Sequence, residues 1–346
     1  MSRRGVRAAR RARSPRWPPG RRRATARPRV WTVRIAVIGL GLIGGSLLRA
    51  LAAAGHDVVG FDADPETRVL ARKAGFRIAG SVRETVAGSQ VTALAVPLQI
   101  LPEVVADLDG YSGLVTDVTS VKGPVRDLLK GRRFVGGHPM AGKETSGFTA
   151  AEVGLFDGCA WVLCLEPHET DLDDWLLLAA MFTGMGARVV PVTAAEHDTA
   201  VAQISHVPHL FAAALAWQLA ENPLAGTLAA GSFRDGTRVA GTRAELIAAM
   251  CGGNWSAVHR VLHSLIGDLE RFEDALTADE PMEALLPVLR ASTRLRRSWP
   301  APPGEPAAVT ADVQALLALG REGGWVTSVN GTELVGLRPE SGRFIP

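Results

Sequence analysis

The chain has 346 residues, of which 47% are hydrophobic and 21% charged, the composition of a folded protein long enough for two domains. No apolar run reaches the roughly 20 residues that a membrane-spanning helix needs, so the sequence predicts no membrane partner. The three cysteines show no CxxC spacing and indicate neither a disulfide framework nor a zinc site, which favours a cytoplasmic location.

Residues 1–29 form a basic arm with twelve arginines and no acidic residue. Because the whole chain carries a net charge of +3, the other residues together sum to −9. A basic arm is typical of a nucleic-acid patch or a targeting peptide, but this one lacks an apolar segment and is poor in serine. We interpret residues 1–30 as a disordered tail, or as an extension upstream of the true start, and expect no nucleic-acid partner for the acidic body.

Short β-rich runs alternate with helical stretches up to Val192. This alternation predicts an α/β fold with a Rossmann-type parallel sheet covered by helices on both faces. We therefore assign residues 31–192 to a Rossmann-type domain. Strands are expected at 33–40, 58–62, 91–96, 114–117, 134–137, 161–167 and 187–192, and helices at 43–54, 65–74 and 172–185.

The pattern changes to helices after Val192, with almost no further strand signal before about residue 297. Thr193 and Glu196 have the spacing of a capping box, which predicts a helix that runs towards Ala220. Pro208 lies inside this helix and is expected to kink it. We assign residues 193–298 to an all-helical domain.

A proline-rich segment follows the helical region and separates it from a short tail. A helix is expected in this tail at 309–319. The Asn330–Gly331 pair lies between two β-rich runs and predicts a hairpin over 325–337. We assign residues 299–346 to this linker and tail, for which the sequence indicates no role.

A GxGxxG motif lies between the first predicted strand and the first predicted helix. In the dinucleotide-binding fingerprint its glycines permit a tight turn, the approach of backbone to a pyrophosphate, and close helix–strand packing. Asp62 ends the second strand, where a carboxylate can accept hydrogen bonds from a ribose and repels a 2′-phosphate. The alternative is a glycine turn that binds no cofactor. We expect NAD, in preference to NADP, at Gly39, Gly41, Leu42, Ile43, Gly44, Asp62 and Pro97.

Two further strands lead to candidate catalytic side chains. Ser120 follows the strand at 114–117 and His138 follows the strand at 134–137, so both are expected at the carboxyl edge of the sheet, where open α/β folds bind ligands. A histidine titrates near neutral pH and can accept a proton while a hydride leaves for the cofactor. Glu144, six residues after His138, could bind the substrate or the histidine. The alternatives are an inert turn histidine and an N-cap role for Ser120.

The helical region contributes further candidates. Ser205 and His209 are four residues apart and share a helix face, although His209 could also be a buried structural histidine. The HxxH spacing of His206 and His209 lacks a nearby acidic or cysteine ligand, so we expect no metal. Arg234 and Arg238 could hold a carboxylate by bidentate hydrogen bonds, and a solvated charged face is the alternative.

Five stretches occur in the order seen in one known family: GLGLIGGSL, DVTSVKG, GGHPMAGKETSG, QISHVPHL and SFRDGTRVA. Over about 33–265 the chain resembles the TyrA family, the prephenate and arogenate dehydrogenases of tyrosine biosynthesis. The resemblance implies a Rossmann-type domain, a helical domain that forms a homodimer, and NAD-dependent oxidative decarboxylation. Its implied site residues are His138 as catalytic base, Ser120 as the group that orients it, Arg238 for the substrate side-chain carboxylate, and Ser205, His209 and Glu144 around the pocket.

We therefore expect conversion of prephenate to 4-hydroxyphenylpyruvate, or of arogenate to tyrosine. Arg243 and Ala244 stand where many members have Asp-Pro, and Ile247 replaces a tryptophan, which leaves the choice of substrate open. A β-hydroxyacid dehydrogenase would need a catalytic lysine on the first long helix of the second domain, and 193–220 contains none. A non-catalytic NAD-binding protein would tolerate the loss of His138.

Overall fold

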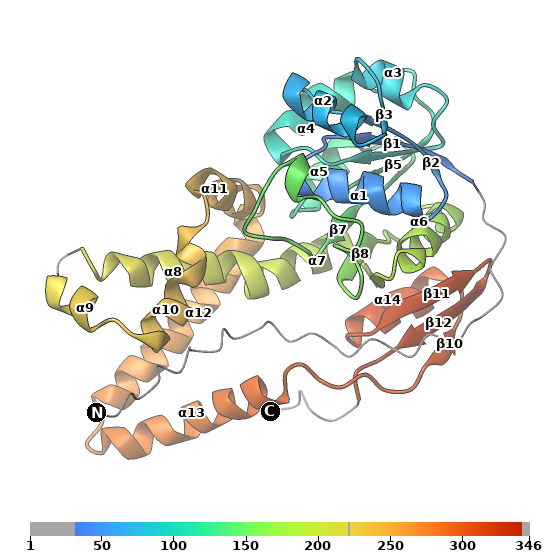
Figure 1. Ribbon diagram of the computed structural model, residues 1–346. Coiled ribbons are helices and arrows are strands. Elements are labelled where there is room, and N and C mark those ends of the chain that lie inside the picture. The colour runs from blue at the N-terminus through green and yellow to red at the C-terminus, as the bar shows by residue number, and fades with distance from the viewer. Residues whose placement is uncertain (1–31, 221, 341–346) are drawn as a thin grey trace, which may run out of the picture.

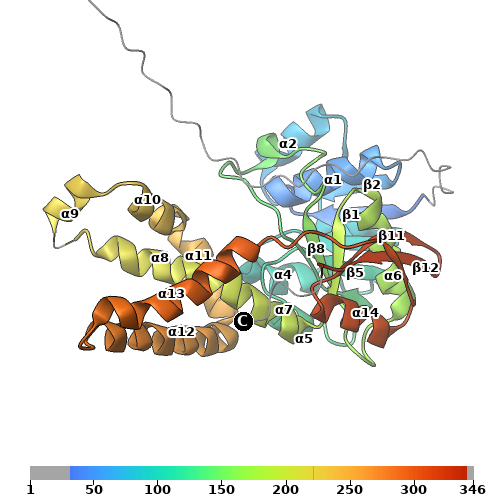
Figure 2. The same ribbon diagram turned by 90° about the horizontal axis from the view of Figure 1, so that it is seen from below.

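The computed structural model describes residues 32–220 and 222–340 (Figure 1). The basic arm predicted at 1–30 lies outside these residues. Among the helices of the described ranges, none combines the length and the apolar character needed to cross a membrane. Two sheets and their helices make up the larger body, from which a helical arm projects (Figures 1 and 2).

The first sheet has six parallel strands in the order β3-β2-β1-β4-β5-β6. This is the strand order of the doubly wound dinucleotide-binding fold, so the predicted fold class is confirmed. The elements are β1 (Arg34–Ile38), α1 (Leu42–Ala53), β2 (Asp57–Phe61), α2 (Pro65–Lys73), β3 (Arg77–Ile78), α3 (Val82–Val86), β4 (Val91–Leu94), η1 (Leu98–Ile100), α4 (Leu101–Ala106), β5 (Leu114–Asp117), α5 (Gly123–Leu128) and β6 (Phe134–Val135).

Burial on both sides of β1 explains its continuous apolar run. Successive side chains of a strand point to opposite faces. Ile35 and Val37 accordingly belong to one core cluster, which also contains Leu47 and Leu51 of α1. Ala36 and Ile38 belong to a second cluster with residues of α3 and α4. The sheet thus has a hydrophobic core on each face, as parallel sheets require.

The strand expected at 134–137 is divided between two sheets. β6 ends at Val135, and β7 (Gly137–Pro139) pairs antiparallel with β8 (Ala160–Cys164) of a second, mixed sheet. His138 therefore lies within β7, opposite Val162, and not after a strand as predicted. A Cβ on Gly137 would come within 2.6 Å of the Asp117 carbonyl oxygen, so only a glycine permits this close passage between the sheets.

The tail beyond the proline-rich segment completes the second sheet, whose order is β10-β12-β11-β9-β8-β7. β11 (Trp325–Asn330) and β12 (Glu333–Leu337) form the predicted hairpin, and β11 also pairs with β9 (Arg188–Val192). β10 (Ala307–Val309) includes Val309, the first residue of the predicted helix. The helix, α14 (Val313–Arg321), begins later because the Asp312 side chain accepts a hydrogen bond from the Ala315 amide at 2.9 Å.

The arm begins with α7 (Ala194–Val201), which opens on the predicted capping box of Thr193 and Glu196. The chain then makes a π-helical turn, η3 (Ala202–His206), and continues as α8 (Val207–Trp217). Pro208 lies in the first turn of α8, so the irregularity precedes the proline instead of being a kink at it. A π-helical turn before a proline makes space for the proline ring, and it accommodates the lack of a backbone N–H group at that residue.

The rest of the arm is helical, as the sequence predicted, and α12 (Trp255–Leu276) and α13 (Pro281–Ser298) meet at the turn between them and diverge away from it (Figures 1 and 2). Both helices leave large apolar side chains exposed, among them Leu276 (60%) and Met282 (81%). The remaining elements of the protein are η2 (Phe148–Ala150), α6 (Leu172–Gly184), α9 (Pro223–Leu228), α10 (Gly231–Thr237), η4 (Arg238–Gly241) and α11 (Ala244–Gly253).

Candidate functional site

The glycine-rich loop has the geometry that a bound pyrophosphate needs. Gly39 has φ +90°, and a Cβ there would lie 2.4 Å from the Ala95 carbonyl oxygen. A Cβ on Gly44 would lie 1.9 Å from the Gly39 carbonyl oxygen, so the start of α1 packs directly on the loop. Gly41 faces open space, with nothing within 4 Å of its ideal Cβ position, and no side chain caps the first turn of α1. The free amides of Leu42 and Ile43 are therefore available to an anion.

Asp62 holds this loop from the end of β2. Its Oδ2 accepts a hydrogen bond from the Leu40 amide at 2.6 Å, and its Oδ1 accepts one from the Asp64 amide at 2.9 Å. A carboxylate has about four acceptor positions, so Asp62 keeps acceptor capacity for ribose hydroxyls. Pro97 lies between β4, the strand beside β1, and η1. It is therefore on the same edge of the sheet as the glycine-rich loop.

The loop after β5 is organised around a buried ion pair. Lys122 and Asp117 are 1% and 0% exposed and are in direct contact. The Lys122 Nζ also donates to the Gly137 carbonyl oxygen at 2.6 Å, and the Asp117 Oδ1 accepts from the Gly137 amide at 3.1 Å. The pair therefore fixes the start of β7, the strand of His138.

Ser120 lies half-buried in the middle of this loop. The alternative that it caps the next helix is wrong, because α5 begins at Gly123 with Lys122 in the N-cap position. The cap comes from another element. Asp198 of α7 accepts hydrogen bonds from the amides of Lys122 and Gly123, both at 2.8 Å.

His138 meets a second histidine from α7. Its Nδ1 lies 2.8 Å from Nε2 of His197, and Nδ1 of His197 lies 2.8 Å from Oδ1 of Asp198. The two imidazole rings are nearly perpendicular, at 76°. An Asp–His–His chain of hydrogen bonds thus runs from the cap of α5 to the half-buried side chain of His138.

Burial lowers the pKa of His138 well below its usual value, and the neighbouring His197, Lys122 and His206 act in the same direction. His138 is therefore a neutral imidazole at pH 7, with one nitrogen free to accept a proton. A neutral histidine with a free acceptor nitrogen is suited to general-base chemistry.

The π-helical turn separates the roles of two neighbouring histidines. The Nδ1 of His209 donates to the Ser205 carbonyl oxygen at 2.8 Å, which leaves its Nε2 as an acceptor, and both residues are half-buried. His206 is buried, and its Nδ1 accepts from Asn254 Nδ2 at 3.2 Å. Burial lowers the pKa of His206 to about 4. The structural histidine of this segment is therefore His206.

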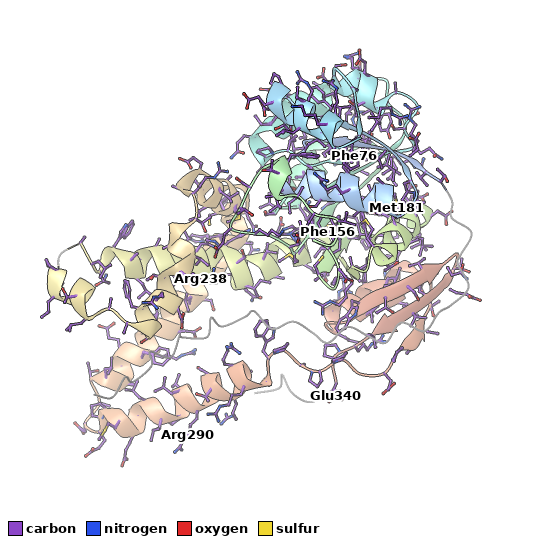
Figure 3. The ribbon with its side chains drawn as sticks, in the orientation of Figure 1. Phe76, Phe156, Met181, Arg238, Arg290 and Glu340 are labelled. Atoms are coloured by element: carbon purple, nitrogen blue, oxygen red, sulfur yellow. The ribbon has the colours of Figure 1, made fainter. Side chains whose placement is uncertain are left out.

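Arg238 and Glu144 are both exposed. Figure 3 shows Arg238 on the helical arm, where η4 packs against α8. Within residues 32–220 and 222–340, no hydrogen bond or ion pair connects either residue to His138, His197 or His209. The structure therefore brings Arg238 near the helix of His209 and leaves Glu144 on the surface.

The prediction from sequence missed His197, Asp198, Asp117 and Lys122. The available signals were local: an Asp and a Lys at the two ends of the DVTSVK stretch, and a His-Asp pair directly after the capping box. Neither signal shows that these polar side chains are buried together.

Two family models match the chain. The prephenate dehydrogenase nucleotide-binding domain matches residues 47–191, and the prephenate dehydrogenase dimerization domain matches residues 193–291. The structure of arogenate dehydrogenase from Synechocystis superimposes with a TM-score of 0.69 at 30% identity, over 77% of this chain and 99% of that one. The chain belongs to the prephenate dehydrogenase family.

Other members of the prephenate dehydrogenase family support this assignment. Prephenate dehydrogenase from Lactococcus lactis is 37% identical over 226 residues, which is 60% of this chain and 61% of that protein. The chain thus spans less than two thirds of the length of this relative. Prephenate dehydrogenase from A. aeolicus, solved in complex with hydroxyphenyl propionate and NAD+, has a TM-score of 0.69 at 25% identity, over 80% of this chain and 99% of that one.

Proposed function

We propose that the protein is an NAD-dependent dehydrogenase that oxidises and decarboxylates prephenate to 4-hydroxyphenylpyruvate. The observation that carries this proposal is the neutral, half-buried His138, held between a nucleotide-binding sheet and α7 by a chain of hydrogen bonds. The relatives named prephenate dehydrogenase, one of them solved with NAD+ and hydroxyphenyl propionate, support the substrate class.

The cofactor would be held at the edge of the first sheet by residues whose geometry suits it. When bound, NAD would supply the hydride acceptor. The open side of Gly41 and the first amides of α1 suit the pyrophosphate, and the Asp62 carboxylate suits a ribose without a 2′-phosphate. The complete proposed set is Gly39, Gly41, Leu42, Ile43, Gly44, Asp62 and Pro97.

The substrate side of the reaction rests on the histidine and its neighbours. His138 would accept the proton of the ring hydroxyl, and Ser120 would orient that hydroxyl. Loss of the ring carboxylate as carbon dioxide makes the ring aromatic, so the driving force lies in the substrate. We further propose Arg238 for the side-chain carboxylate, and Ser205, His209 and Glu144 around the ring.

A spectrophotometric assay of NADH formation tests the function. Purified protein is supplied with prephenate or arogenate, each with NAD and with NADP. We expect NADH to form fastest with prephenate and NAD. Absence of product with both substrates would overturn the proposal, and faster turnover of arogenate would move the assignment to arogenate dehydrogenase, the activity named for the Synechocystis protein at 30% identity.

We also propose that residues 193–298 form a homodimer interface. Exposed apolar side chains follow the arm from α8 to α13, and the region matches a dimerization domain. A monomer rarely leaves so many large apolar side chains uncovered. The division of the chain after Val192, like the cytoplasmic location, stays a prediction.

The pH dependence of kcat/KM follows from the lowered pKa of His138. A general base must be neutral, so activity is present above this pKa and is lost as the pH falls through it. Because burial moves the pKa well below 6.5, we expect kcat/KM to stay level between about pH 6.5 and 7.5 and to fall only at lower pH. A pH–rate profile with NAD and prephenate measures this, and an acid limb above pH 6.5 would contradict it.

The charge of Asp62 should set the choice between NAD and NADP. Two like charges about 4 Å apart repel by about 1 kcal/mol even in water, which corresponds to about fivefold in affinity. Asp62→Asn keeps an acceptor for the Leu40 amide but removes the charge, so we expect the preference for NAD over NADP to fall at least about fivefold. The measurement is the ratio of kcat/KM values for the two cofactors.

Asp64→Asn is the matched control, because Asp64 is exposed and its side chain caps α2 without touching the glycine loop. This variant should leave the preference within about twofold, since Asn is an equally good N-cap. An equal change in both variants would contradict the proposal that the Asp62 charge selects NAD over NADP.

A further inference from the structure

We propose that His197 and Asp198 are positioning residues that hold His138 in the tautomer with hydrogen on Nδ1, so that Nε2 is the atom that accepts the substrate proton. This inference rests on the proposed function, because it names the reactive atom of the same base. It concerns residues that the sequence motifs left without a role.

The direction of each hydrogen bond follows from the Asp198 end of the chain. An ionised carboxylate can only accept, so Nδ1 of His197, 2.8 Å from Asp198 Oδ1, carries a hydrogen. A neutral imidazole has one N–H group, so Nε2 of His197 is an acceptor. The atom 2.8 Å away, Nδ1 of His138, must therefore donate. The lone pair of His138 is left on Nε2.

His197 is neutral for a physical reason. It is 2% exposed, and burial lowers its pKa even though the bond to Asp198 acts in the opposite direction. Were it charged, both of its nitrogens would donate, and His138 would have to offer its lone pair to His197. The reactive lone pair would then be lost to the substrate.

Asp198 is fixed by groups from several elements. Its carboxylate accepts from the amides of Lys122 and Gly123 at the start of α5, each at 2.8 Å. Its carbonyl oxygen accepts from Asn254 Nδ2 at 2.7 Å, at the start of α12. The carboxylate therefore cannot rotate away from His197 without uncapping α5.

The same arrangement stabilises the charged state that proton transfer creates. The substrate O–H bond breaks and an N–H bond forms at Nε2 of His138, which becomes an imidazolium. This cation keeps its donor bond to neutral His197, whose other nitrogen faces the Asp198 carboxylate. No proton needs to reach Asp198, as in the Ser-His-Asp triad, where the aspartate orients the imidazole and does not itself become protonated.

The test compares two substitutions of His197. His197→Leu removes the acceptor for His138 Nδ1, whereas His197→Gln places an amide oxygen within reach of it. We expect His197→Leu to lower kcat about 100-fold with KM for NAD within about threefold, and His197→Gln to recover at least about tenfold of that loss. His168→Asn is the control, because His168 is an exposed loop residue with φ 67°, a conformation that Asn tolerates.

Nitrogen NMR of histidine-labelled full-length protein reads the tautomer directly. The signals of His138 are assigned by their loss in His138→Asn. We expect hydrogen on Nδ1 of His138 in the unsubstituted protein and a mixture of tautomers in His197→Leu.

Hydrogen on Nε2 of His138 in the unsubstituted protein would overturn the inference, as would a kcat for His197→Leu within about threefold of normal. The NMR result does not depend on turnover. It therefore decides the inference even if His197→Leu fails to fold, or if the protein forms no NADH and the proposed function fails.

Discussion

His138→Asn is expected to keep NAD affinity within about threefold while kcat falls by about 10²- to 10⁴-fold, the usual contribution of a general base. The structure gives the reason: His138 lies in β7 with its ring held by His197, and an asparagine amide cannot accept a proton at neutral pH. NADH formation measures kcat, and titration of the protein with NAD measures the affinity.

His209→Asn is a useful comparison for this result. His209 lies on α8 with its Nδ1 bonded to the Ser205 carbonyl oxygen, so its Nε2 can contact a substrate, but no histidine and carboxylate pair positions its ring. We expect this variant to change KM for the substrate more than kcat. Normal turnover in His138→Asn would show that His138 is not the general base, whereas a non-catalytic NAD-binding protein would bind NAD and form no NADH with or without the substitution.

The Rossmann part of the fold was predictable because its signals are local. The alternation of strands and helices needs only a few residues at a time, and the glycine motif lies entirely between β1 and α1. The capping box of Thr193 and Glu196 and the Asn330–Gly331 hairpin are local in the same way. In each case the residues that form the contact are close in sequence.

The environment of His138 was not predictable because it depends on distant contacts. His138 and His197 are 59 residues apart, and Lys122 and Asp198 are 76 apart. No periodicity reports such a pair. The division of the expected strand at 134–137 is also a tertiary effect, because β7 forms by pairing with β8 of another sheet.

The helical arm and the tail beyond it each show the same limit. A proline inside a helix predicts an irregularity, but the sequence does not distinguish a kink at Pro208 from the π-helical turn that precedes it. The hairpin of β11 and β12 was visible in the sequence, whereas its pairing with β9 joins residues more than a hundred positions apart. The sequence therefore predicted the element and not its partner.

The buried ion pair of Asp117 and Lys122 stabilises the protein and also holds the start of β7, the strand of His138. Lys122→Met tests the contribution to stability. The substitution leaves the fully buried Asp117 carboxylate with only its hydrogen bonds to Thr119 and the Gly137 amide. Removing one partner of a buried pair costs about 3–5 kcal/mol in the free energy of unfolding. At roughly 2–4 °C per kcal/mol, we expect thermal unfolding at least about 6 °C lower.

Two comparisons make the result specific. Arg77→Met removes an exposed ion pair with Asp57 in the same sheet, which is worth about 0–1 kcal/mol, so its unfolding temperature should fall by less than about 4 °C. Lys122→Met combined with Asp117→Asn leaves no unpaired charge and should recover part of the loss. If the Lys122→Met protein were no less stable than the Arg77→Met protein, this would contradict the expectation that the buried pair contributes more to stability than the exposed one. Because Lys122 also holds the Gly137 carbonyl oxygen, the stability lost should be accompanied by a lower kcat from a displaced His138.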